Sequence, residues 1–146
     1  MPDISRVSVE VANWLTTLHL SGRAEYAGYL VVEEMLTNIV KYSYDDADEH
    51  TVYLHVALDE EYLRITLKDD GHYFDPTQIP VPDVEELLES RKVGGLGIEL
   101  VRRMCERIEY NRADGWNICV FFIRRLSPAD TQPLNRAAFS IPEKTL

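Results

Sequence analysis

A glycine-rich stretch, Gly94 to Ile98, leads directly into the amphipathic run that begins at Glu99, and it strongly constrains how this chain can fold. Glycines let backbone amides approach a ligand closely, and the first N–H groups of a helix are free to bind an anion. Such a stretch is typical of a phosphate site, but it also occurs as a tight connection before a helix. The rest of the chain has to decide between these two interpretations.

Apolar residues recur at helical spacing in three long segments. The spacing predicts a first helix from Asp3 to about Leu20, ended by Ser21-Gly22, and a second helix from about Ala24 to Tyr42. A third helix should begin at the glycines and continue to about Arg107.

Alternating apolar and polar residues predict four strands that form two hairpins. The predicted strands are 51–57, 62–68, 108–112 and 117–125. Helices on one face of a mostly antiparallel, mixed sheet of about four strands make a two-layer α/β sandwich, which is the fold class we expect. We assign one domain to residues 1–126 and a proline-containing tail to residues 127–146, in which 137–141 is the most apolar part.

The segment between the second strand and the glycines is rich in turn formers and proline. Residues 69–76 predict a turn, and Pro80 and Pro82 exclude regular structure around them. A short helix is expected from Asp83 to about Ser90. Residues 77–93 could therefore cover the glycine stretch as a short lid.

The chain has 15 Lys plus Arg and 25 Asp plus Glu, for a formal net charge of −10. This charge disfavours a direct nucleic-acid partner, and the chain has no apolar run long enough for a membrane span and no signal peptide, so we expect a cytoplasmic protein. The acidic clusters at 45–49 and 83–89 are either solvated surface or a docking patch for a basic protein. Cys105 and Cys119 lack metal-site spacing and are expected to be buried free thiols.

Two polar groups stand next to apolar positions. Glu34 and Asn38 are four residues apart on the second helix, so they are neighbours on one face. They are either ordinary helix surface, or a Mg²⁺ ligand (Asn38) with a base or water-positioning group one turn earlier (Glu34). Glu33 is the alternative carboxylate, but it faces Thr37.

Asp69 and Gly71 follow the second strand. The pair could simply form a type I turn. Alternatively, the carboxylate could accept a hydrogen bond from an exocyclic amine while the glycine lets a flat ring approach.

The order and spacing of these pieces fit the Bergerat nucleotide fold of the GHKL ATPases. More closely, the chain resembles the anti-sigma-factor serine-protein kinases of bacterial stress and sporulation switches. Residues 34–44 resemble that family's E-x-x-T-N-x-x-x-H-x-Y box, and residues 69–76 match its D-x-G-x-x-F-D-P box at every fixed position. Residues 94–101 match its last glycine box, residues 109–117 resemble its closing hairpin, and the whole resemblance spans about residues 5–126.

The resemblance implies a role for each matching residue. Asn38 would bind the Mg²⁺ that bridges the ATP phosphates, and Glu34 would take the proton from an incoming serine hydroxyl. Asp69 would bind the adenine amine, with Gly71 beside the ring. The remaining nucleotide-binding positions would be Gly95, Leu96 and Gly97, with the two glycines presenting amides to the phosphates.

The implied activity is that of an ATP- and Mg²⁺-dependent protein serine/threonine kinase. Such a kinase binds a sigma factor and phosphorylates a small antagonist protein in a partner switch, and a homodimer is compatible with this role. Two alternatives stay open: a nucleotide-sensing module that transfers no phosphate, and a detached ATPase domain of a histidine kinase.

Three features depart from the family pattern. Tyr42 stands where His is common, and Cys105 stands where an acidic residue is usual. The first helix begins almost at residue 3, so the usual leading strand is missing and a sheet edge needs cover. We expect residues 137–141 to cover it, in the same subunit or in a neighbouring one.

Overall fold

The computed structural model describes residues 4–80, 83, 85, 95–125 and 138–145, with only the backbone described for Gly95 and residues 138–145. Its elements in chain order are α1 (Ile4–Leu15), the 3₁₀ helix η1 (Thr16–Leu18), α2 (Gly22–Tyr42), β1 (Thr51–Leu58), β2 (Tyr62–Asp69), α4 (Gly95–Met104), β3 (Arg107–Ala113), β4 (Trp116–Arg124) and β5 (Ala138–Thr145). The short helix expected at Asp83 to Ser90 falls mostly outside the described residues.

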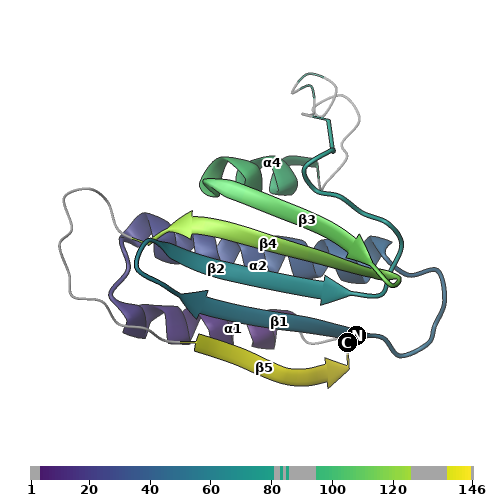
Figure 1. The fold of residues 1–146 in the computed structure, drawn as a ribbon, viewed down its shortest axis with the longest axis horizontal. Coiled ribbons are helices and arrows are strands. Elements are labelled where there is room, and N and C mark those ends of the chain that lie inside the picture. The colour runs from purple at the N-terminus through teal and green to yellow at the C-terminus, as the bar shows by residue number, and fades with distance from the viewer. Residues whose placement is uncertain (1–3, 81–82, 84, 86–94, 126–137, 146) are drawn as a thin grey trace.

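The strands form one sheet in the order β3-β4-β2-β1-β5, and each neighbouring pair is antiparallel. Helices α1 and α2 lie across one face of this sheet, and α4 packs beside α2 (Figure 1). The predicted two-layer α/β sandwich is therefore confirmed. The sheet differs from the expectation in having five strands instead of four, and in having no parallel pairing among the described strands.

The apolar core lies between the helices and the sheet. Alternate residues of the central strands point into it, as the period-2 pattern predicted. Its most completely buried large side chains come from both layers: Leu15, Val31, Leu36, Leu63, Ile65, Leu67, Val101 and Phe121. Each buried side chain of this size contributes about 1.5–3 kcal/mol by leaving water, so the core fixes α2 firmly against β2 and β4.

The boundary between the first two helices differs from the prediction. Helix α1 ends at Leu15 and continues only as η1, after which His19 adopts a left-handed conformation with φ 53°. Ser21 belongs to the next helix, because its Oγ accepts the N–H of Ala24 at 3.1 Å as the N-cap of α2. Ser21-Gly22 thus begins α2, whereas we predicted that it ends the first helix.

The β3–β4 hairpin is closed by two residues, Asp114 and Gly115, with φ of 52° and 80°. Two successive left-handed residues give a turn whose twist matches that of the strands. This tight turn sets the β3–β4 register, which pairs Arg112 with Asn117.

Strand β5 lies along β1 at the edge of the sheet, from Ala57 opposite Ala138 to Thr51 opposite Thr145. This is the kind of edge cover that we assigned to residues 137–141, although the strand is longer. The register shifts between Val52 and Leu54, so that Pro142 falls in an irregular part of the ladder. A proline has no N–H to donate, and such a position in an edge strand tolerates it.

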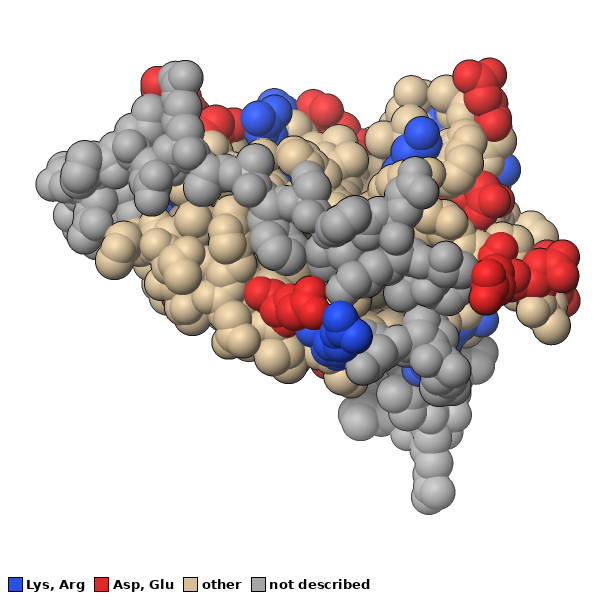
Figure 2. All heavy atoms as spheres, turned by 90° about the horizontal axis from the view of Figure 1, so that it is seen from below, with Lys and Arg blue, Asp and Glu red and all other residues tan. Residues whose placement is uncertain are grey.

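Acidic side chains form several separate groups on the face seen from the β5 edge, and Lys and Arg side chains lie between them (Figure 2). Among the described helices, none combines the length and apolar character needed to cross a bilayer.

Both cysteines are free thiols, as expected, but only Cys119 is buried, whereas Cys105 is half-buried. Burial raises the pKa of the Cys105 thiol to about 12.

Candidate functional site

Asp69 is the last residue of β2, and its side chain is only 5% exposed. Its Oδ1 accepts the N–H of Gly71 at 3.0 Å and the Nδ2 amide of Asn117 at 3.1 Å. Burial raises the pKa of the Asp69 carboxyl, and these two hydrogen bonds work in the opposite direction. The carboxylate is therefore held in one orientation in a poorly hydrated place, which suits the recognition of a hydrogen-bond donor.

The loop after Asp69 lies directly on the end of α2. A Cβ on Gly71 would stand 2.4 Å from Cβ and 2.7 Å from the carbonyl oxygen of Ser43, the C-cap of that helix. The same carbonyl accepts the N–H of His72 at 2.9 Å. Glycine is required at position 71 because no side chain fits between the loop and the helix end.

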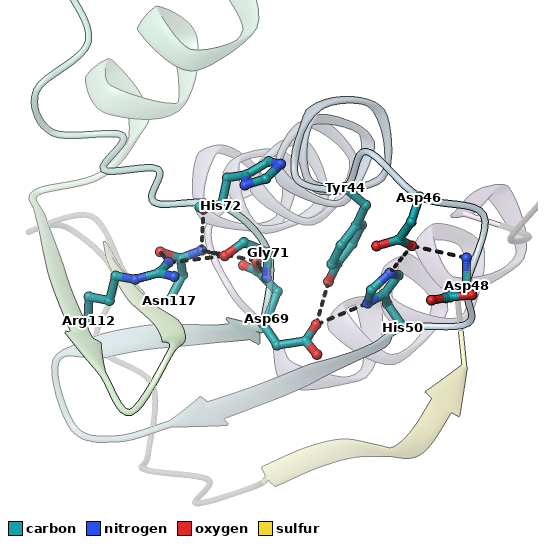
Figure 3. A network of polar contacts seen from close by, with 10 residues as sticks. Tyr44, Asp46, Asp48, His50, Asp69, Gly71, His72, Arg112 and Asn117 are labelled. Atoms are coloured by element: carbon teal, nitrogen blue, oxygen red, sulfur yellow. Dashed lines mark hydrogen bonds and ion pairs between the residues drawn. The ribbon is translucent and has the colours of Figure 1, made fainter.

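Asn117, the second residue of β4, is a site residue that the sequence analysis did not select. Its Nδ2 donates to Asp69 and to the carbonyl of His72 at 2.7 Å. Its Oδ1 accepts from the hydroxyl of Tyr110 at 2.5 Å and from Arg112 at 2.8 Å. Figure 3 shows this buried amide between the loop and the β3–β4 hairpin. The one sequence signal was its place at the end of the closing hairpin, which gave it no role.

Glu34 and Asn38 lie one turn apart in the middle of α2, and α4 packs against this part of the helix. A Cβ on Gly97 would stand only 2.0 Å from Oε2 of Glu34. The half-buried Glu34 carboxylate therefore lies against the first turn of α4. The structure thus brings together two predicted site residues that are far apart in the sequence.

Asn38 is 8% exposed, and its Nδ2 has no hydrogen-bond partner within the described structure. An unpaired buried amide is costly unless a ligand or water completes it. Because the O and N of an amide are nearly indistinguishable in shape, this side chain can turn its carbonyl oxygen to a cation, so the position fits a Mg²⁺ ligand.

The glycine box forms the start of α4, with Gly95 as its first residue. Gly97 is buried against Glu34, whereas the Leu96 side chain is 54% exposed. The box therefore places the free N–H groups of a helix beside Glu34. This is the geometry of an anion site.

Of the predicted lid, 77–93, the structure describes residues 77–80, 83 and 85. Thr77 is held by Asp75, whose Oδ1 accepts both its N–H at 2.9 Å and its hydroxyl at 2.6 Å. Arg102 of α4 donates to the carbonyls of Thr77, at 3.0 Å, and of Ile79. Residues 77–79, which follow the loop after Asp69, are therefore fastened to the helix that begins at the glycines.

The predicted site residues form two groups along α2. Asp69 and Gly71 lie at its C-terminal end, while Glu34, Asn38 and Gly97 lie near its middle. Glu34 and Ser43 are nine positions apart, which corresponds to about 13.5 Å along the helix axis. One elongated ligand with a ring at one end and phosphates at the other can reach both groups.

A fold of this kind, with a glycine box at a helix start and a buried Asp at a strand end, defines a nucleotide-binding domain of the histidine kinase type. Residues 3–122 match the family model described as histidine kinase-like ATPase domain, and the chain belongs to this family. Family membership identifies an ATP-using domain.

Among curated relatives, the serine/threonine-protein kinase BtrW of Bordetella bronchiseptica is 29% identical over 108 residues, covering 71% of this chain and 76% of the relative. The serine-protein kinase RsbW of Listeria monocytogenes is 26% identical over 117 residues, covering 71% and 74%. The anti-sigma F factor of Oceanobacillus iheyensis is 23% identical over 130 residues, covering 84% of each chain. The resemblance to the anti-sigma serine-kinase group is thus confirmed at modest identity.

One solved structure, the histidine kinase domain of the blue-light activated histidine kinase EL346 from Erythrobacter litoralis, matches with a TM-score of 0.52 at 16% identity. The match covers 82% of this chain and 62% of that one. At this identity the likeness supports the fold.

Proposed function

We propose that this chain is an ATP- and Mg²⁺-dependent protein serine kinase that acts as an anti-sigma factor. The packing of Glu34 against Gly97 carries the proposal, because it puts a carboxylate beside the amides where a transferred phosphate would lie. The names of the relatives, which include serine-protein kinases and an anti-sigma F factor, support the same activity. The proposed partners are a sigma factor and a small antagonist protein whose serine is phosphorylated.

Phosphoryl transfer depends on positioning and on neutralising charge more than on covalent help from the protein. In this proposal Asp69 accepts a hydrogen bond from the adenine amine, and Gly71 gives the ring room. Gly95 and Gly97 donate backbone N–H groups to the phosphates. Asn38 is the residue that would hold Mg²⁺, which when bound neutralises phosphate charge.

Glu34 has the role of general base. As the serine oxygen bonds to the γ-phosphorus and the bond between that phosphorus and the bridging oxygen of ADP breaks, the serine proton passes to the Glu34 carboxylate. Its half-buried position next to α4, away from the open helix surface, supports this role. A group with this role typically contributes about a hundredfold or more to the rate.

Transfer of labelled γ-phosphate from ATP to candidate antagonist proteins tests the proposal, starting with the products of neighbouring genes. We expect Glu34→Gln to reduce transfer by about a hundredfold or more while ADP affinity changes little. Glu33→Gln is the matched control, because Glu33 is the adjacent carboxylate and interacts with Tyr29, whose pKa it raises. Equal losses in the two variants, or undiminished transfer in Glu34→Gln, would remove Glu34 from the base role.

The same assay separates the two alternative functions. Tight ATP binding with no transfer to any partner would support a nucleotide-sensing module. Phosphate that is lost from the partner in acid would indicate a phosphohistidine and hence a histidine-kinase domain, whereas phosphoserine survives acid.

A further inference from the structure

A second polar cluster lies next to the proposed adenine site, in the loop that joins α2 to β1. Asp70, the neighbour of Asp69, uses its Oδ1 to accept the hydroxyl of Tyr44 at 3.2 Å. The same oxygen lies 3.4 Å from Nδ1 of His50. Asp69 is thus held by Asn117 of β4, whereas Asp70 is held by Tyr44 and His50 of the α2–β1 loop. Figure 3 shows Asn117 on one side of Asp69 and Tyr44 and His50 on the other.

His50 contacts a carboxylate with each of its ring nitrogens. Its Nε2 lies 2.6 Å from Oδ1 of Asp46, and its Nδ1 faces Asp70. A neutral imidazole can donate from only one nitrogen, so both contacts are satisfied at once only by the protonated ring. The ring also stacks on Tyr44, with centroids 3.8 Å apart and planes inclined by 14°, and its side chain is 18% exposed.

The described groups that face His50 are acidic or neutral. Asp46 and Tyr44 come from the same α2–β1 loop as His50, and Asp70 directly follows β2. Burial raises the pKa of the Tyr44 hydroxyl well above the usual range. Beside them, His72 and Asp45 form a separate, exposed pair at 2.7 Å. Without a charge on His50, Asp46 and Asp70 would lose their shared counter-charge, and Asp70, whose charge disfavours the charge on Asp69, would be less well neutralised.

We propose that protonated His50 is a positioning residue of the nucleotide site, which fastens Asp70 to the α2–β1 loop and thereby holds Asp69 ready for the adenine amine. The inference rests on the proposed role of Asp69 in nucleotide binding. His50 itself touches no nucleotide in this proposal and acts through Asp70.

The direction of the pH effect follows from the contacts. The hydrogen bond with Asp46 raises the pKa of His50 above its ordinary value, so the protonated ring is present below that raised pKa and is lost as pH rises through it. Burial raises the pKa of Asp69, so its charge is lost as pH falls. Nucleotide affinity should therefore pass through a maximum, with His50 responsible for the alkaline decline.

Titration calorimetry of ADP with Mg²⁺ from about pH 5 to about pH 9 tests this, since imidazole groups change charge in that interval. For the unchanged chain we expect affinity to fall about fivefold on the alkaline side, the effect of losing one partly exposed ion pair. His50→Gln should have the weaker affinity throughout and no alkaline decline. His72→Gln, which removes the neighbouring pair, should keep the decline.

Titration of the His50 ring by nuclear magnetic resonance, with and without ADP, gives a second measurement. A purely structural role of His50 would not make its pKa depend on ADP. Because linkage is reciprocal, saturating ADP should raise the pKa of the His50 ring in the unchanged chain. Asp70→Asn should abolish that change while leaving the ring in place, and this test remains decisive if His50→Gln does not fold.

An alkaline decline that persists in His50→Gln, or a His50 pKa that ADP does not alter, would overturn the proposal. So would a decline that disappears in His72→Gln. A chain that binds no ADP at any pH would instead refute the proposed function, so the two failures are distinguishable.

Discussion

At the scale of single residues, the side chain of Asn117 supports the loop that follows Asp69, which we propose to bind adenine. Its amide is 3% exposed and joins Asp69 and the carbonyl of His72 to the β3–β4 hairpin. Asn117→Ala leaves these buried groups unpaired, so we expect the free energy of unfolding to fall by about 2 kcal/mol and ADP affinity to fall about tenfold. Urea denaturation and calorimetry measure the two effects. Asn111→Ala, at an exposed position of β3, should change neither, and equal effects in both variants would contradict the argument.

Local spacing was enough to name Glu34, Asn38 and Asp69 as candidates, because each belongs to a short pattern, but their proposed roles came from the family resemblance. It could not select Asn117, which lies 48 residues from Asp69 and meets it only through the register of β2 against β4. The contact between Gly97 and Glu34 could not be predicted from the sequence either, because it depends on how closely α4 packs against α2.

At the scale of elements, substitutions at two glycines measure the free-energy cost of backbone conformation alone, because neither position has a steric conflict. Gly115 closes the β3–β4 hairpin with φ of 80°, and Gly22 begins α2; a Cβ would meet nothing within 4 Å at either position. Gly115→Ala should lower the free energy of unfolding by about 1 kcal/mol, because L residues disfavour the left-handed region. Gly22→Ala should be neutral or stabilising by up to about 1 kcal/mol. Chemical denaturation of the two variants measures both, and equal destabilisation would show that the left-handed conformation at Gly115 carries no extra cost.

Element type was predictable where periodicity is strong, and element ends were not. Ser21-Gly22 combines a capping residue with a helix-ending glycine, and only the hydrogen bond from Ala24 to Ser21 shows that it begins α2. Residues 127–146 were assigned to a tail because they contain Pro128, Pro133 and Pro142, although 137–141 was expected to cover the sheet edge. Pairing with β1 around an irregular register makes the strand possible, and that pairing is a tertiary contact that no local pattern contains.

At the scale of the whole molecule, α2 connects the two groups of proposed site residues, one for the phosphates and one for adenine. It carries Glu34 and Asn38, the residues proposed to act at the phosphates, and its C-cap Ser43 accepts the N–H of His72 from the loop proposed to bind adenine. Its buried face packs on β2, so the spacing between the two groups is set by a rigid element. Nucleotide binding should therefore need little rearrangement of α2, and the differences among relatives should lie in the loops at its two ends.

The sheet has one edge that depends on a strand from the far end of the chain. Removal of residues 126–146 would uncover β1, whose unpaired N–H and C=O groups could then pair with another molecule. We expect the shortened chain to lose roughly 2–4 kcal/mol of folding free energy, for several ladder hydrogen bonds at about 1 kcal/mol each, and to associate more strongly with increasing concentration than the full chain. Denaturation and sedimentation velocity measure these effects. Gly115→Ala in the full chain is the control, because it reduces stability with β5 in place and should not increase association. A shortened chain as stable and as weakly associating as the full one would show that β5 contributes nothing to the sheet.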